Sequence, residues 1–134
     1  MHHPCLTQLD VMRLERMLHA RGQLADDEGE RIGAILDNAD IVPGEVIADN
    51  VVTMNSLVAY RDLDTGLECE ATLVYPSLAD NAHQRLSVTS CVGAALLGMR
   101  VGESIAFTLP NGVQRHMQIL AIPFQPEAAG QFHL

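Results

Sequence analysis

The sequence predicts an α+β fold in which a short N-terminal antiparallel helical hairpin precedes an antiparallel β-sheet domain with one short helix. Apolar residues recur at helical spacing up to about residue 40, and they alternate with polar residues beyond residue 51. A segment that contains Pro43-Gly44 and has no helical stripe separates the two patterns. We therefore expect the hairpin at residues 1–45 and the β-rich domain at residues 46–134.

Helix signals stand at two places in the N-terminal part. Thr7, with Asp10 three positions later, resembles a capping box, and Gly22 marks the end of the first helix. The second helix opens around Asp27, and its apolar stripe consists of Ile32, Ile35, Leu36 and Ala39. Helices of some 13 to 15 residues are only about 20 Å long, so the hairpin is short.

Alternation predicts two β-hairpins in the second part. Residues 67–75 alternate until Pro76 stops them, and a strand-rich stretch at 51–60 precedes them across a turn. A second pair of runs, 105–109 and 113–122, flanks an Asn-Gly turn, in which both residues accept positive φ. Between the hairpins we expect a short strand at 86–88 and a short helix at 92–97 that ends at Gly98.

Charge and cysteine content exclude several classes of function. Eight basic against 17 acidic residues give a net charge of -9, which leaves no electrostatic basis for direct sequence-specific nucleic-acid binding. Three widely spaced cysteines without a C-x-x-C pair argue against a disulfide framework or a zinc ribbon, and favour a reducing cytoplasm. The N-terminus resembles no signal peptide, and no apolar run is long enough to cross a membrane.

The known signatures of enzymes are missing from the sequence. It contains no P-loop, no nucleotide-binding glycine fingerprint and no serine-centred nucleophile elbow. We therefore expect no enzymatic activity, no cofactor and no small-molecule substrate. Cys91 precedes the short helix, where a thiol pKa would fall, but no motif supplies a base. His2, His3 and Cys5 could hold a transition metal, but they stand at a terminus that we expect to be frayed.

An acidic cluster marks the tip of the predicted hairpin. Asp26, Asp27 and Glu28 stand at the start of the second helix, where carboxylates cap free N–H groups and complement the helix dipole. Capping is the interpretation that the position favours. A partner-facing role and divalent-cation binding by hard oxygen ligands remain open as alternatives.

Blocks of sequence in the second part resemble the C-terminal domain of the Gre transcript-cleavage factors. They occur in the same order as in that family, at residues 52–58, 62–66, 86–98, 101–103 and 110–113. The resemblance implies an FKBP-like domain behind an N-terminal antiparallel coiled coil, and RNA polymerase as the partner. It also implies that Ser90 and Cys91 match the Ser-Pro loop with which the family contacts polymerase, although cysteine replaces the proline.

In Gre factors the coiled coil enters the secondary channel of polymerase, and its acidic tip helps to hold the catalytic magnesium. A hairpin of about 20 Å would leave Asp26 and Asp27 short of that metal. The resemblance therefore predicts a regulator that docks near the channel and competes with Gre-type factors without cleaving transcripts. The alternative is a protein-interaction module that acts on nucleotide metabolism through another partner. Prolyl isomerisation, known for FKBP-like folds, is not expected from five scattered aromatic residues.

Overall fold

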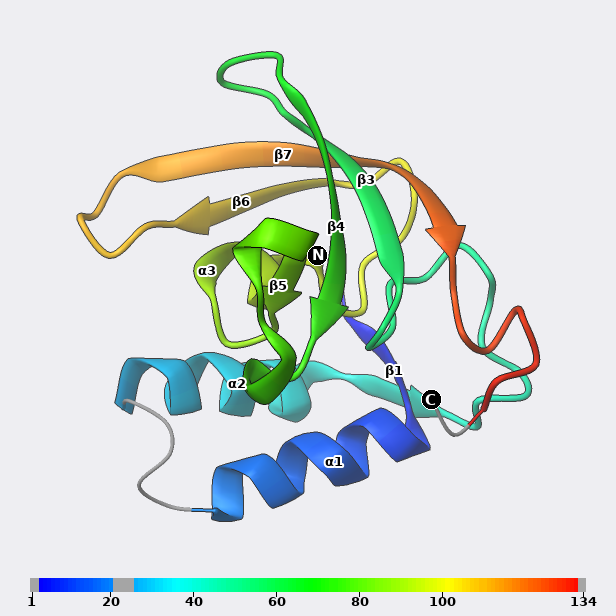
Figure 1. Ribbon diagram of the computed structural model, residues 1–134. Coiled ribbons are helices and arrows are strands. Elements are labelled where there is room, and N and C mark those ends of the chain that lie inside the picture. The colour runs from blue at the N-terminus through cyan, green and yellow to red at the C-terminus, as the bar shows by residue number, and fades with distance from the viewer. Residues whose placement is uncertain (1–2, 21–25, 133–134) are drawn as a thin grey trace.

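The computed structural model describes residues 3–20 and 26–132, and it confirms the α+β class (Figure 1). Within the described residues, no helix is long and apolar enough to cross a membrane. The elements in chain order are β1 (Cys5–Thr7), α1 (Gln8–His19), α2 (Asp26–Asn38), β2 (Asp40–Val42), β3 (Leu57–Asp62), β4 (Glu68–Val74), the 3-10 turns η1 (Pro76–Leu78) and η2 (Asn81–His83), β5 (Arg85–Ser87), α3 (Cys91–Leu96), β6 (Ser104–Thr108) and β7 (Gln114–Phe124).

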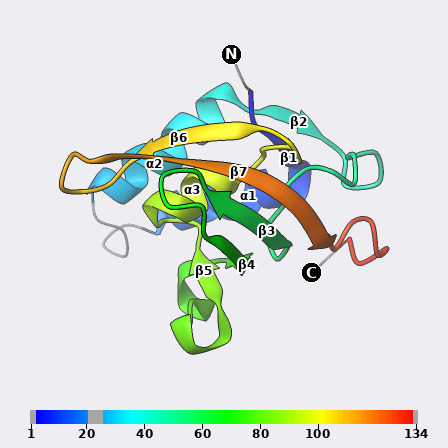
Figure 2. The ribbon, with the colours of Figure 1, turned by 90° about the horizontal axis from the view of Figure 1, so that it is seen from above.

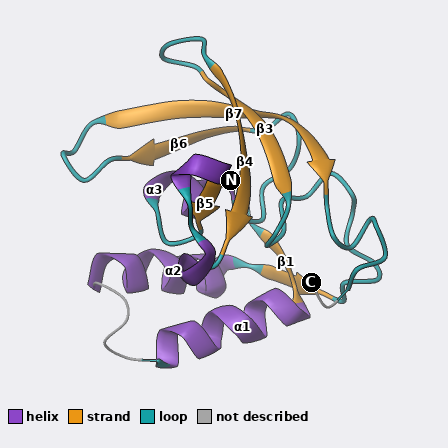
Figure 3. Cartoon of the chain, in the orientation of Figure 1, coloured by secondary structure: helices purple, strands orange, loops and turns teal. Residues whose placement is uncertain are grey.

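Five strands form one curled sheet in the order β5-β4-β3-β7-β6 (Figures 1 and 3). β3 pairs antiparallel with β4 and β7, and β6 pairs antiparallel with β7. β5 runs parallel to β4, so the prediction of an antiparallel sheet is wrong for this pair. The physical reason is the connection, because η1 and η2 carry the chain back to the level of Thr72 in β4 instead of turning it directly into a hairpin.

The turns refine two of the strand predictions. The stretch 51–60 becomes a strand only from Leu57, because the Ser56 N–H donates to the Thr53 carbonyl at 3.1 Å and closes a turn. At the Asn-Gly turn between β6 and β7, Gly112 has φ +85°. Asn111 does not share this conformation, and its side-chain oxygen instead accepts a hydrogen bond from the Val113 N–H at 3.0 Å.

A second sheet, which the sequence analysis missed, joins the two ends of the helical segment. β1 and β2 pair in parallel, with Cys5 opposite Asp40. Cys5 is buried, and its N–H donates to the Gly98 carbonyl at 3.0 Å. The expectation of a frayed terminus is therefore wrong at Cys5, and the expected linker begins within β2. Strands of three residues are too short to show alternation, which explains the omission.

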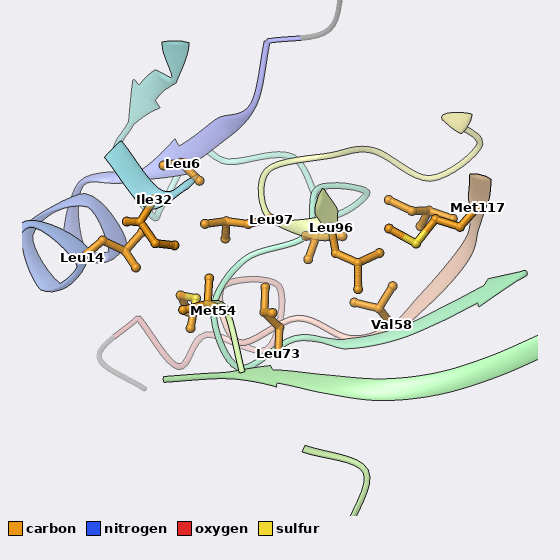
Figure 4. Packing of buried hydrophobic residues seen from close by; sticks show 12 residues of the cluster. Leu6, Leu14, Ile32, Met54, Val58, Leu73, Leu96, Leu97 and Met117 are labelled. Carbon is orange, nitrogen blue, oxygen red and sulfur yellow. The ribbon is translucent and has the colours of Figure 1, made fainter. Parts of the chain in front are cut away.

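The hydrophobic core includes residues from both helices and from the sheet. Leu14 of α1 and Ile32 of α2 are fully buried in one cluster with Leu97, Met54 and Leu73 (Figure 4). α1 and α2 contact each other, and both lie beside the curled sheet rather than projecting from it (Figures 1 and 2). The division into 1–45 and 46–134 stays a prediction, as do the coiled coil and the FKBP-like character.

A buried carboxylate connects α1 to the segment before β3. Thr7 caps α1 by accepting the Asp10 N–H at 3.1 Å, as the sequence predicts. The Asp10 side chain does not complete a capping box. It is 1% exposed, and one of its oxygens accepts the Met54 N–H at 3.0 Å. Burial raises the pKa of Asp10 to about 6, with a contribution from the Glu127 carboxylate, while the Met54 N–H lowers it.

This burial predicts a pH-dependent stability. Because the pKa of Asp10 is higher in the folded chain than in the unfolded chain, its favourable contribution is lost as pH rises from about 4 to about 6. Asp10→Asn removes the charge and keeps an acceptor for Met54. We expect the variant to gain on the order of 2 kcal/mol over the wild type between pH 4 and pH 7. Urea unfolding across this range measures the difference.

The control for this prediction is Asp10→Ala, which removes both the charge and the acceptor. It leaves the Met54 N–H buried without its partner, and this costs about 1–3 kcal/mol at every pH. Parallel pH profiles for the wild type and Asp10→Asn would show that Asp10 is not the group responsible.

Candidate functional site

The loop before α3 is held by its own hydrogen bonds. The Ser90 hydroxyl donates to the Ser87 carbonyl at 2.7 Å and accepts the Gly93 N–H at 3.0 Å, which makes Ser90 the N-cap of α3. The Thr89 N–H donates to the Ser87 hydroxyl at 3.1 Å. The loop that contains Ser90 and Cys91 is therefore a fixed surface feature at the end of β5.

Close contact between α3 and β5 depends on a glycine. A Cβ atom at Gly93 would lie 2.0 Å from the Ser87 carbonyl oxygen, well inside any tolerated contact. The first turn of α3 can therefore approach the end of β5 only because residue 93 has no side chain.

Cys91 opens onto a groove between three elements. The cavity has a volume of about 290 Å³, and its walls come from α2, α3 and β6. Cys91 is half-buried there, and the Arg31 guanidinium donates a hydrogen bond to the Thr89 carbonyl. The residues that line the groove are Arg31, Ile35, Cys91, Ala94, Ala95, Phe107 and Thr108.

The acidic cluster lies at the start of α2. Asp26 and Asp27 begin the helix, but their side chains lie outside the described part of the chain. Glu28 is half-buried, and it stands three residues before Arg31, on the same face of the helix. Because Arg31 reaches Thr89, the structure brings this turn of α2 close to the Ser90 loop.

Metal binding has no support among the described side chains. No three His, Cys, Asp or Glu side chains of residues 3–20 and 28–132 lie close enough to hold an ion. Cys5, Cys69 and Cys91 are free thiols. The absence of a metal site at the acidic tip itself stays a prediction.

Most of the groove was not predicted from the sequence. Ile35 was assigned only to the apolar stripe of its helix, Phe107 lies within an alternating run, and Arg31 carried no prediction. The groove forms where α2, α3 and β6 meet, so no local spacing could have indicated it. The one available signal was Arg31, a cation that follows the acidic helix start by one turn.

The contact at Gly93 gives a second testable prediction. Gly93→Ala forces the Ser87 carbonyl and the α3 backbone apart, so we expect a loss of about 2–4 kcal/mol in the free energy of unfolding. Gly33→Ala is the matched control, because a Cβ there meets nothing within 4 Å on helix α2. The control should gain up to about 1 kcal/mol. Equal effects of both substitutions in urea unfolding would contradict the prediction.

Comparison with known proteins agrees with the fold. Residues 47–124 match the family described as "Transcription elongation factor, GreA/GreB, C-term". This match spans more than half of the chain, and a solved structure of the same family shares the fold, so the chain belongs to the GreA/GreB family.

One relative within the family is similar to this chain over nearly its full length. The regulator of nucleoside diphosphate kinase of Escherichia coli (strain K12) is 40% identical over 129 residues, which cover 96% of this chain and 95% of the relative. Segments 51–56, 73–76, 92–98 and 125–130 of this sequence already resemble that regulator, and the match confirms the resemblance.

Gre factors themselves are more distant. The transcription elongation factor GreA of Thermotoga petrophila is 36% identical over 75% of this chain and 67% of its own length. A solved GreA/GreB structure from Nitrosomonas europaea has a TM-score of 0.73 and 32% identity, and it covers 92% of this chain and all of the other. The relatives are thus named as a regulator and as elongation factors.

Proposed function

We propose that this protein is a transcription regulator that binds RNA polymerase near the secondary channel and competes there with Gre-type factors, without cleaving transcripts. The observation that carries the proposal is the match of residues 47–124 to the GreA/GreB C-terminal domain, which contains the Ser90 loop. RNA polymerase works in the bacterial cytoplasm, so we propose the same compartment for this chain.

The geometry around Ser90 and Cys91 supports a docking role. The loop is held by the Ser90 cap and by the hydrogen bond from Arg31. Docking would therefore cost little conformational entropy of the loop backbone. The groove beside it offers the apolar side chains of Ile35 and Phe107 next to the Arg31 guanidinium. Such a mixed surface, apolar with an arginine, is typical of protein interfaces.

The helices support binding without cleavage. α1 has 12 residues and α2 has 13, so each is about 18–20 Å long. Leu14 and Ile32 bury these helices in the core, and Asp10 ties α1 to Met54, so the pair does not extend freely from the domain. We infer that the acidic start of α2, at Asp26, Asp27 and Glu28, contacts polymerase without reaching its catalytic metal.

A second function has one specific observation in its favour. The Escherichia coli relative is named for nucleoside diphosphate kinase, and it matches this chain over nearly its full length. An effect on the level of that kinase could follow from polymerase binding, which is our proposal. It could also follow from an interaction module that regulates nucleotide metabolism through another protein partner.

Binding to polymerase gives a third prediction. Ser90→Asp with Cys91→Glu keeps an N-cap residue but adds two negative charges to the docking loop. We expect at least about tenfold weaker co-purification with RNA polymerase from the double variant. The control is Leu67→Asp with Cys69→Glu, which adds the same charge at the exposed start of β4 and should bind normally. Binding that excess Gre factor does not displace would favour the alternative partner.

The absence of cleavage gives a fourth prediction. Added to a backtracked polymerase complex, the protein should leave the transcript intact while slowing cleavage by added Gre factor, because both occupy one site. Gel analysis of labelled transcripts measures this outcome. Cleavage by this protein alone would show that its helices reach the active centre.

A further inference from the structure

A second concave site lies on the other face of the sheet. Ala71 and Leu73 of β4 are buried toward the core, where α3 also packs through Leu96. Side chains alternate along a strand, so Thr72 and Val74 face the opposite side. There they line a pocket of about 370 Å³ together with Asn55, Leu78, Arg85 and Phe124.

One wall of this pocket is apolar and contiguous. Val74 is almost fully buried in its floor, Phe124 ends β7 beside it, and Leu78 of η1 stands at the rim with 54% of its surface exposed. Beside these apolar residues, the pocket has room for one branched or aromatic side chain of a ligand.

The lining of the pocket also includes a cation. Arg85 is exposed, and in the described part of the chain its guanidinium makes no hydrogen bond or direct ion pair. The neighbouring Asp80 carboxylate is hydrogen-bonded to the His83 ring at 2.6 Å and to the Ala82 N–H at 2.9 Å, and it attracts Arg85 electrostatically without a direct ion pair. By contrast, Arg61 and Arg115 are both paired with carboxylates.

The amide of Asn55 adds a second polar group to the lining of the pocket. Its backbone has φ 68° and is fixed because its N–H donates to the Leu73 carbonyl at 2.6 Å. Neither the side-chain amide of Asn55 nor the hydroxyl of Thr72 has a hydrogen-bond partner among residues 3–20 and 28–132. Three polar groups with free hydrogen-bonding capacity thus converge beside an apolar wall.

We propose that this pocket binds the C-terminal residue of a partner polypeptide that ends in leucine or phenylalanine. Arg85 pairs with the terminal carboxylate, the apolar side chain lies against Val74, Leu78 and Phe124, and Asn55 bonds to the last peptide group.

The chemistry favours a chain terminus over an internal acidic residue. At a terminus, the carboxylate and the apolar side chain share one carbon atom, so both fit one small pocket. In an extended internal Glu-Leu pair, the two side chains project to opposite sides. A chain of net charge -9 also repels a segment with several acidic side chains more strongly than it repels a single carboxylate.

The site is independent of the proposed polymerase contact. Ser90 and Cys91 lie at the start of α3, on the core face of the sheet, while Arg85 and Asn55 open onto the other face. Failure of one binding event therefore leaves the other measurable in the same protein.

The test titrates the full chain with N-acetyl-Gly-Gly-Leu as the free acid and as the C-terminal amide, and follows backbone amide signals by NMR. We expect the free acid to shift the signals of Asn55, Thr72 and Arg85, and the amide to bind at least roughly tenfold more weakly. Arg85→Gln should cause a similar loss. Arg16→Gln, at an exposed arginine on α1 whose guanidinium likewise makes no hydrogen bond or ion pair with a described residue, should bind as the wild type does.

Several results would overturn the proposal. These are equal binding of acid and amide, full binding by Arg85→Gln, and no binding by the free acid at millimolar concentration. Tighter binding of an internal Glu-Leu peptide would reassign the site to acidic segments. Equal binding of 4-methylpentanoate would reassign it to small organic acids. Leu78→Ser, at an exposed position, tests the apolar wall without loss of the core, and it should also weaken binding.

Discussion

The placement of the helical pair depends on one hydrogen bond, from the Met54 N–H to the Asp10 carboxylate. Met54 belongs to the buried segment before β3, and Asp10 stands in the first turn of α1, so the bond fixes the helix against the core end of the sheet. Around this bond, the Glu127 carboxylate accepts from the Thr53 hydroxyl at 2.7 Å. The N-terminal helix, the central turn and the C-terminal tail therefore meet at one polar cluster inside an otherwise apolar region.

Hydrogen bonds connect both helices to the rest of the fold. Asp10 fixes the first helix, and Arg31 fixes the second helix to the Ser90 loop. The surface proposed to meet polymerase is therefore formed jointly by α2, α3 and β6. Arg31 of α2 is bonded to Thr89, which lies in the same loop as Ser90 and Cys91. We therefore expect that a substitution in α2 can shift this loop and alter docking without changing Ser90 or Cys91.

Local patterns allowed much of the fold to be predicted, and the failures have local causes. The Thr7 cap, the short helix before Gly98 and the long last strand all follow from spacing and capping chemistry. β1 and β2 were missed because three residues show no period. Asp10 was assigned to a capping box because its spacing from Thr7 fits one. The spacing does not show whether the carboxylate binds the N–H of the cap residue or an N–H that is distant in sequence, as it does at Met54. The candidate site was predicted only as a loop, since its groove arises from elements far apart in sequence.

The parallel pairing of β1 with β2 has a consequence for how the length of the helical pair can change in evolution. Cys5 lies opposite Asp40, so the points where the chain enters and leaves the helical pair are hydrogen-bonded neighbours. Residues inserted between Leu14 and Ile32 would lengthen both helices and leave these anchor points in place. The length of the helical pair can thus change in evolution by whole turns of helix, while the sheet and its two proposed binding faces stay the same.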